Sequence, residues 1–203
     1  MPANPPSLSA HDLACRRGDR LLFRRLSFAL APGAACHVTG ANGAGKTTLI
    51  RAAAGLTTPY AGEVRRTGAL ALLDERSGLD PDLPLGRALA FWFGLDGAGK
   101  ADTIMARLRL EALAEVPVRY LSTGQKKRAA LARVLGQAAP IWLLDEPLSG
   151  LDTASQGLVS ELVREHCAQQ GIALIASHQP LDVPGMTSFA IEHFAPAQQE
   201  HEA

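Results

Sequence analysis

The chain has 203 residues, of which 47% are hydrophobic, so it can bury the core of one enzyme-sized domain. Lys plus Arg and Asp plus Glu number 20 each, and this balance gives no indication of a nucleic-acid or acidic-membrane partner. No stretch approaches the ~18 apolar residues of a membrane span, and the N-terminus lacks a secretion-signal pattern, so we expect a cytosolic chain that does not itself cross a membrane.

Neither the cysteines nor the chain ends carry a recognisable motif. Cys15, Cys36 and Cys167 lack the spacing of metal ligands or of a disulfide framework, so we interpret them as buried thiols in a reducing compartment. The Pro-rich segment 1–7 and the polar segment 196–203 are expected to be loose. The whole chain, 1–203, is expected to form a single domain.

The first predicted elements are strands over residues 21–30 and 34–38, separated by a turn at Ala-Pro-Gly, residues 31–33. The second strand leads directly into a glycine-rich segment. A helix is predicted over residues 47–54, with Gly55 ending it. The order is therefore strand, glycine loop, helix.

The middle of the chain, residues 83–139, has a helical pattern, with helices predicted over 85–95, 102–113 and 122–138. Residues 141–144 then form a short, continuous apolar run that is typical of a buried parallel strand. A helix over 154–170 and a second buried strand over 172–176 follow. The helical segment 83–139 is therefore interpreted as an insertion before these elements.

The glycine-rich segment GANGAGKT, residues 40–47, matches G-x-x-x-x-G-K-[ST] at every fixed position. Glycines let the backbone curl so that successive amides point at phosphate oxygens, and the start of the helix adds partial positive charge. Lys46 is predicted to bond the terminal phosphates and Thr47 to ligate Mg²⁺. The strand-loop-helix context disfavours a chance glycine turn, but every class of P-loop NTPase remains open. The predicted nucleotide-binding residues here are Gly40, Ala41, Asn42, Gly43, Ala44, Gly45, Lys46, Thr47 and Thr48.

Two carboxylates, Asp145 and Glu146, follow the buried strand 141–144 directly. Parallel sheets present ligand-facing groups at the carboxyl ends of their strands, so we expect both side chains near the phosphates. Asp145 is predicted to hold Mg²⁺, directly or through water, and Glu146 to polarise the water that attacks the γ-phosphate. An ordinary solvated turn is the alternative interpretation of this pair.

The segment YLSTGQKKRAALAR, residues 120–133, contains Ser122 and Gln125 three positions apart, which predicts a capping box at the start of an amphipathic helix. The same geometry presents the helix amides, the Ser122 hydroxyl and the Gly124 backbone as a second phosphate-binding end. Ser122, Gly124 and Gln125 are therefore predicted to contact nucleotide. Capping alone is the alternative.

Together these motifs resemble the nucleotide-binding domain of ATP-binding cassette (ABC) transporters, over about residues 25–182. The loop at 40–47 resembles Walker A, and 141–146 resembles Walker B. Residues 121–125, Leu-Ser-Thr-Gly-Gln, resemble the LSGGQ signature with Thr in place of the first Gly. Residues 149–152, Ser-Gly-Leu-Asp, are similar to the D-loop, and His178 falls where the family has a catalytic switch histidine. The resemblance therefore adds His178 to Glu146 and Lys46 as catalytic residues.

The resemblance implies a P-loop NTPase (RecA-like) α/β core, an antiparallel β-subdomain and a small helical subdomain, here about 83–139. It also implies an ATPase that uses ATP and Mg²⁺ and forms a head-to-tail homodimer, in which ATP on one subunit is capped by Ser122 and Gly124 of the other. Integral membrane permease subunits would follow the opening and closing of this pair.

Two positions depart from the family pattern. The family often stacks an upstream tyrosine on adenine, whereas residues 15–18, Cys-Arg-Arg-Gly, offer only the guanidinium of Arg16 or Arg17. Glu75 stands where the family usually has the Q-loop glutamine, a ligand of Mg²⁺ that also couples to the permease. Glu75 is therefore a candidate metal ligand whose charge differs from the usual one.

The cargo is suggested by the run His-Gln-Pro-Leu at 178–181, which resembles the ATP-binding subunit of the cytochrome c maturation heme exporter. That resemblance implies an ATPase on the cytoplasmic face of a bacterial inner membrane, working in heme export or heme-chaperone release. No residue resembles a heme ligand, so heme is expected to contact other subunits. A transporter for another cargo remains open. A soluble cassette protein acting on ribosomes or DNA is disfavoured, because the chain has neither a second cassette nor a long coiled-coil insertion.

Overall fold

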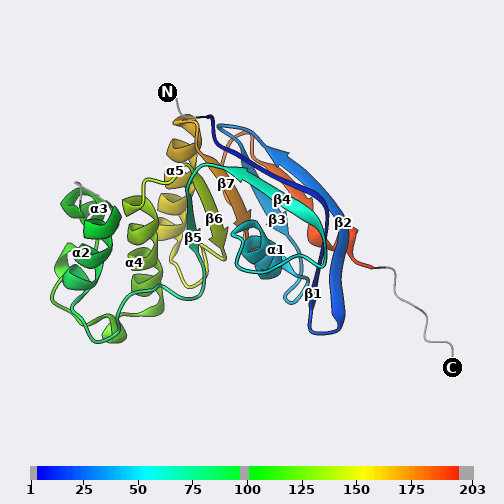
Figure 1. Ribbon diagram of the computed structural model, residues 1–203. Helices are drawn as coiled ribbons and strands as arrows, with labels where there is room; N and C mark the ends of the chain where they lie inside the picture. Colours follow the sequence, from blue (N-terminus) through cyan, green and yellow to red (C-terminus); the bar gives the residue numbers. More distant parts are fainter. Residues whose placement is uncertain (1–3, 97–100, 197–203) are drawn as a thin grey trace.

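The computed structural model describes residues 4–96 and 101–196, which form two β-sheets, helices packed on these sheets and a group of helices at one end of the molecule (Figure 1). A parallel sheet has the strand order β5-β6-β7-β3-β8, and an antiparallel sheet has the order β2-β1-β4. The parallel strands are β3 (Ala35–Thr39), β5 (Leu70–Leu73), β6 (Ile141–Asp145), β7 (Ile172–Ala176) and β8 (Thr187–Ala190). The antiparallel strands are β1 (Ser7–Arg17), β2 (Arg20–Leu30) and β4 (Ala61–Thr67).

Helix α1 (Lys46–Ala53) lies between the two sheets and joins them through one apolar core. Leu49 and Ile50 on this helix are fully buried. They belong to the same cluster as Phe23 of β2 and Leu174 of β7. The glycine loop before α1 is therefore held at a fixed place between the sheets by burial on both faces of the helix.

The opposite face of the parallel sheet is covered by α4 (Thr123–Gly136) and α5 (Thr153–Ala168). Helices α2 (Leu85–Asp96) and α3 (Ala101–Arg107) pack on α4 and form a helical group at one end of the molecule (Figure 1). Short 3₁₀ turns lie at η1 (Glu111–Leu113), η2 (Val118–Tyr120) and η3 (Ile191–Phe194). A second apolar core joins these helices to the sheet.

The predicted fold class is confirmed: a parallel α/β P-loop core carries an antiparallel sheet and a helical group. Cys15, Cys36 and Cys167 are buried free thiols, as expected. Their pKa values are raised by burial, to about 11 for Cys15. In the described part of the chain, no helix has the length and apolar character that a membrane crossing requires.

Some predicted boundaries were wrong. The helix expected over 102–113 ends at Arg107, because Arg109 adopts φ 53°, which a right-handed helix does not allow, and the chain then turns into η1. The expected loose segment 1–7 overlaps β1 at Ser7, where pairing with β4 begins; pairing with β2 begins at Leu8. Residues 1–3 and 197–203 of the two expected loose ends lie outside the described residues. Strands β1, β4, β5 and β8 were not predicted.

The parallel direction of the five strands brings their carboxyl ends to one edge of the sheet. Along that edge the strand order places, one after another, the segments that follow β5, β6, β7, β3 and β8. These segments begin with Asp74, Glu146, Ser177, Gly40 and Ile191, respectively. Each candidate catalytic motif except the signature therefore leaves the sheet at this edge, which we call the carboxyl edge.

Candidate nucleotide-binding site

The glycine loop runs from β3 to α1 at the carboxyl edge. Its apex at residues 41–43 is exposed, whereas Gly45 and Lys46 at its end are buried. A Cβ atom on Gly45 would lie 3.1 Å from the Phe23 ring and 3.2 Å from Leu22, so the loop end is pressed against β2. The loop is therefore open to a ligand on one side and fixed by the antiparallel sheet on the other.

Lys46 is the first residue of α1, and only 6% of it is exposed. Its Nζ atom donates to the carbonyl oxygens of Gly40 at 2.7 Å and Ala41 at 3.2 Å, and lies 3.7 Å from Oε1 of Glu146. The ammonium group is thus curled back over its own loop. A triphosphate would offer it stronger, charge-assisted acceptors at the same place.

Asp145 ends β6 and is 4% exposed. Burial raises the pKa of this carboxyl group most, while a hydrogen bond from the Thr47 hydroxyl lowers it. Within the described chain, its Oδ1 atom has no hydrogen-bond partner. A buried carboxylate oxygen without a partner, beside a hydroxyl, is a donor set that fits Mg²⁺.

No group of three or more His, Cys, Asp or Glu side chains in the described residues is arranged to hold a metal ion. A metal at Asp145 and Thr47 would therefore take its remaining ligands from phosphate oxygens and water, which is the usual arrangement for Mg²⁺ with a nucleotide.

Glu146 lies at the centre of the charged contacts on this edge. Its backbone adopts φ 46°, an uncommon value for a non-glycine residue, and its N–H donates to Ala176 O at 2.8 Å. Its Oε2 atom lies 2.8 Å from Nδ1 of His178, and its Oε1 atom faces Lys46. The turn after β6 therefore places the Glu146 carboxylate between the ammonium group of Lys46 and the imidazole of His178.

His178 follows β7, the strand next to β6, and its side chain is 51% exposed. The three residues predicted to be catalytic, Lys46, Glu146 and His178, thus come together, although Glu146 lies 100 positions after Lys46 and His178 a further 32 after Glu146. A carboxylate in this position can orient a water molecule and accept its proton, while the imidazole holds the carboxylate in place.

The signature segment forms the predicted capping box. The Gln125 N–H donates to Ser122 Oγ at 3.3 Å, and the Ser122 N–H donates to Gln125 Oε1 at 2.8 Å. Ser122 and Thr123 are exposed at the start of α4. In the described residues, Ser122, Gly124 and Gln125 make no hydrogen bond with the glycine loop or with Asp145. They form a second, separate surface on the same chain.

Gly124 lies against the D-loop of its own chain. A Cβ atom on Gly124 would come within 2.9 Å of the Gly150 carbonyl oxygen, and one on Gly150 within 2.9 Å of Thr123 Cγ2. Asp152 then caps α5 by accepting from the Ser155 N–H at 2.7 Å, and this bond lowers its pKa. The signature segment and the D-loop are therefore packed as one unit.

Sequence reasoning missed Lys127, which lies near the carboxylates of this edge, and Tyr60, which lies beside Arg16. Lys127 of α4 is partly buried; burial lowers its pKa most, while the nearby charges of Asp145, Glu146 and Glu75 raise it. Tyr60 lies under the guanidinium of Arg16, whose Cζ atom is 5.0 Å from the ring centroid. The local sequence does not predict these contacts, because Lys127 belongs to a basic helix and Tyr60 to a loop, and neither pattern indicates a tertiary neighbour.

Glu75 follows β5 in an exposed segment beside the end of β6. Its charge is close enough to raise the pKa of Asp145, although the structure gives it no ion pair of its own in the described residues. The neighbouring Asp74 contacts Arg51 of α1 at 3.8 Å. Glu75 therefore lies at the carboxyl edge, as predicted for a metal ligand, but it is exposed whereas Asp145 is buried.

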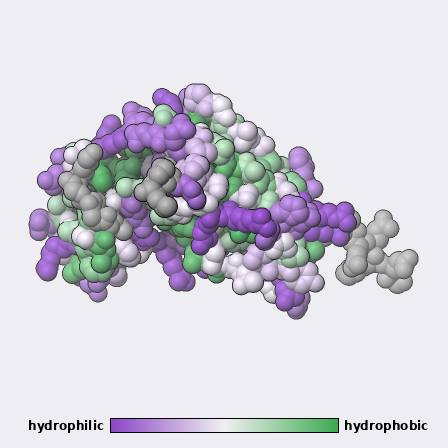
Figure 2. All heavy atoms as spheres, turned by 45° about the horizontal axis from the view of Figure 1, so that its top comes forward, coloured by the Kyte–Doolittle hydropathy of each residue, from purple (hydrophilic) through white to green (hydrophobic). Residues whose placement is uncertain are grey.

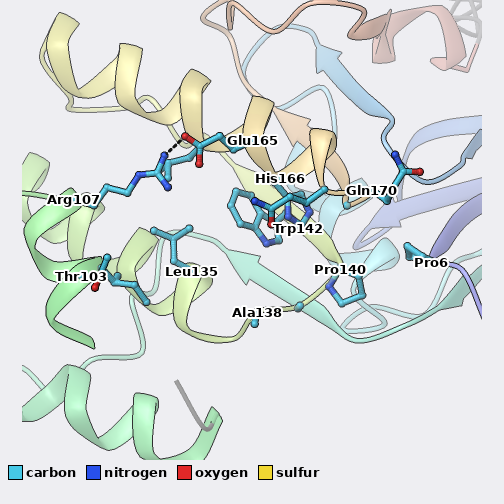
Figure 3. A pocket seen from close by; sticks show the side chains of 15 residues that line it. Pro6, Thr103, Arg107, Leu135, Ala138, Pro140, Trp142, Glu165, His166 and Gln170 are labelled. Atoms are coloured by element: carbon cyan, nitrogen blue, oxygen red, sulfur yellow. Dashed lines mark hydrogen bonds and ion pairs between the residues drawn. The ribbon is translucent and has the colours of Figure 1, made fainter. Parts of the chain in front are cut away.

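A hollow of about 610 Å³ lies at the other edge of the sheet, where β6 and β7 begin (Figure 3). Trp142 and His166 stack beside it with ring centroids 3.9 Å apart, and the Arg107–Glu165 ion pair spans 2.6 Å at its rim. Burial lowers the pKa of His166, so a neutral imidazole packs on the indole. None of the predicted site residues lines this hollow.

Comparison with known proteins identifies the family of the chain. The profile of a family described as ABC transporter matches residues 23–149, which is more than half of the chain. The chain belongs to the ABC transporter family. The match includes the glycine loop, the signature segment and both carboxylates of residues 145 and 146.

Curated ABC relatives are similar over nearly the whole chain. A protein of Novosphingobium aromaticivorans named "Cytochrome c biogenesis ATP-binding export protein CcmA" is 54% identical over 93% of this chain and 97% of its own length. The protein of the same name from Zymomonas mobilis is 48% identical over 92% of this chain and 85% of its own. Among solved structures, an ABC transporter ATP-binding protein from Pyrococcus furiosus superposes with a TM-score of 0.80 at 24% identity, covering 94% of this chain and all of that one.

Proposed function

We propose that this protein is the ATP-hydrolysing subunit of a membrane transporter complex that works in cytochrome c biogenesis, in heme export or in release of a heme chaperone. The ATPase assignment follows from membership of the ABC family. It is supported above all by Glu146, whose carboxylate lies between Lys46 and His178 at the carboxyl edge. The names of the relatives support the pathway, because each is called a cytochrome c biogenesis ATP-binding export protein.

The proposed mechanism assigns one task to each residue. Residues 40–48 cradle the phosphates, and Lys46 moves from its loop carbonyls to the β- and γ-phosphates. Thr47 and Asp145 would hold Mg²⁺, which neutralises charge on the phosphates when it is bound. Glu146 orients the attacking water and accepts its proton, and His178 keeps the carboxylate in position.

A head-to-tail homodimer would complete the site. Ser122 and Gly124 lie on a surface separate from the glycine loop of their own chain, and Ser122 and Thr123 are exposed there at the start of α4. Such an end of a helix can bind phosphate oxygens of a nucleotide held by a second copy. We therefore propose that each signature segment caps the ATP of the partner subunit.

Integral membrane permease subunits are the proposed partners on the helical group. Helix α2 exposes Phe91 and Leu95, and Figure 2 shows hydrophobic surface at the end of the molecule that α2 and α3 occupy. Exposed apolar side chains of this kind are typical of surfaces that contact another protein. We propose that the subunit lies peripherally on the cytoplasmic face of a bacterial inner membrane, bound to these permease subunits. No nucleic acid and no direct heme contact are proposed.

The test is purification of the tagged chain from detergent-solubilised membranes, with identification of every subunit that co-purifies. We expect integral membrane proteins and an ATPase activity that depends on them. The cargo is tested by adding heme or an apo-cytochrome to the purified complex and measuring stimulation of hydrolysis. Co-purification with ribosomes and without a membrane protein would contradict the transporter assignment, and stimulation only by an unrelated solute would contradict the heme assignment.

Gly124→Ala is expected to lower the ATPase rate about tenfold or more, while ATP binding by the isolated chain stays within about twofold. The added Cβ would lie 2.9 Å from Gly150 O, a backbone atom, so the signature segment or the D-loop has to shift. Steady-state hydrolysis and calorimetric binding measure the two quantities. Lys126→Ala, at an exposed position of the same helix, is the control. An unchanged rate in Gly124→Ala would show that this packing does not matter for closure.

Glu75→Gln is expected to weaken the Mg²⁺ dependence of hydrolysis and to change the rate several-fold, with little effect on folding. A carboxylate attracts the cation but repels the γ-phosphate, and attraction prevails while the metal is bound. The measurement is ATPase rate against Mg²⁺ concentration for both proteins, with Glu63→Gln as a control on an exposed carboxylate of β4. Superimposable curves would show that Glu75 is a solvated loop residue.

A further inference from the structure

The first peptide of the glycine loop, which joins Gly40 to Ala41, is held from both sides by opposite charges. Its carbonyl oxygen, on Gly40, accepts from Lys46 Nζ at 2.7 Å. Its N–H, on Ala41, donates to the carboxylate of Glu192. In a trans peptide these two groups point in opposite directions, so Lys46 and Glu192 bind the same peptide from opposite sides.

Glu192 reaches the loop because β8 runs parallel to β3, with Thr39 opposite Ala190. The chain then turns into η3, where Ile191 is fully buried and fixes the turn. Phe194 packs edge-on against Phe189 with ring centroids 5.8 Å apart. The buried Ile191 and the Phe189–Phe194 contact therefore fix the backbone on both sides of Glu192, so that its exposed carboxylate lies beside the glycine loop.

The proximity of the Glu192 carboxylate also explains why position 40 is a glycine. Its φ is 144°, in the region that favours glycine, and a Cβ atom there would lie 2.6 Å from Oε2 of Glu192 and 2.8 Å from Oε1. The first glycine of the motif therefore makes room for a protein carboxylate. The pKa of Glu192 is lowered mainly by the bond from the Ala41 N–H, with a smaller effect from the charge of Lys46.

We propose that Glu192 is a positioning residue that keeps the Gly40–Ala41 peptide in its ligand-ready orientation when Lys46 leaves it for the phosphates of ATP. The inference rests on the proposed function of the loop. Once Lys46 turns to the triphosphate, the peptide loses its bond on the carbonyl side, and the glycine permits it to rotate. A rotated peptide would aim the Gly40 carbonyl oxygen at the Glu192 carboxylate, which repels it, so Glu192 opposes rotation both by its bond and by its charge.

The charge of Glu192 also has a cost. It lies near Lys46 and reduces the positive potential that attracts a triphosphate. The bond to Ala41 and the negative charge therefore act on ATP affinity in opposite directions. A glutamine keeps an oxygen acceptor and removes the charge, whereas an alanine removes both.

Three variants separate these effects. We expect Glu192→Ala to raise the Kd for a non-hydrolysable ATP analogue with Mg²⁺ by about three- to tenfold, because a bond to a charged acceptor is lost. Glu192→Gln should bind as tightly as the wild type or several-fold more tightly. Glu63→Ala, which removes an exposed carboxylate elsewhere, should not change the Kd. In steady-state hydrolysis, Glu192→Ala should raise KM and leave kcat within about twofold.

The binding measurements are calorimetric, and thermal unfolding of each variant shows whether it is folded. Failure of the wild type to bind the analogue would contradict the function of the loop itself. If the wild type binds the analogue and Glu192→Ala has the same Kd, the role proposed for Glu192 is wrong, while the function of the loop stands. A Glu192→Gln variant as weak as Glu192→Ala would also overturn it. If Glu192→Ala does not fold, the comparison of Glu192→Gln with the wild type still decides, because weaker binding there contradicts the proposal.

Discussion

Replacing Lys46 by alanine is expected to abolish measurable ATP binding. The ammonium group is buried and already lies within hydrogen-bond distance of two loop carbonyls, so it reaches the phosphates without a large rearrangement. Charge-assisted bonds contribute about 1.5–3 kcal/mol each, and the loss of two such bonds lowers affinity by roughly 100-fold or more. Removing Lys46 also leaves the Glu146 carboxylate without its nearby cation, which adds repulsion toward the phosphates.

Binding is measured with a fluorescent ATP analogue and by calorimetry. Lys126→Ala is the matched control, because it removes an equal charge from an exposed position on α4. Thermal unfolding of Lys46→Ala should remain cooperative, since the aliphatic core of α1 is untouched. Near-normal nucleotide binding by a folded Lys46→Ala protein would show that residues 40–47 are not the binding site.

The parts of the site that the sequence predicts are those in which chemistry and backbone geometry are local. Residues 40–47 predict an anion-binding loop because the glycines, the lysine and the helix start are contiguous. Asp145 is predictable because a buried apolar run indicates a parallel strand, and the carboxyl end of such a strand faces ligand. The capping box of Ser122 and Gln125 needs only a spacing of three.

The parts that could not be predicted depend on contacts between distant segments. Glu192 reaches Ala41 only because β8 pairs with β3, and the two residues are separated by 151 positions. The approach of Lys127 to Asp145 and Glu146 depends on how α4 is oriented over the sheet, which a basic helical pattern does not specify. The tertiary packing of the elements determines these contacts, and local sequence preferences do not predict that packing.

Strand prediction failed where burial is weak or the element is short. Strand β4 (Ala61–Thr67) is largely exposed and polar, so it lacks the apolar alternation on which strand prediction relies. Strand β5 (Leu70–Leu73) has only four residues, too few to distinguish from a loop or a helix start. Both are stabilised as strands by their partners, β1 and β6 respectively.

Glu146→Gln is expected to keep ATP binding and to slow hydrolysis by about two to four orders of magnitude, the usual effect of losing a general base. Glutamine preserves the volume of the side chain and an oxygen that can face Lys46 or His178, so the site should keep its shape. It cannot accept the proton of the attacking water. Loss of one negative charge beside the γ-phosphate should also strengthen ATP binding, which stabilises the nucleotide-bound dimer.

Single-turnover hydrolysis measures the slow chemical step, and size-exclusion chromatography with Mg²⁺ and ATP measures the dimer. Glu165→Gln is the matched control, because Glu165 pairs with Arg107 at the opposite edge of the sheet and should leave the rate unchanged. A wild-type rate in Glu146→Gln would exclude Glu146 as the base. A slow variant that stays monomeric with ATP bound would instead separate the two proposals: Glu146 would remain the base, while closure of the dimer would require the permease.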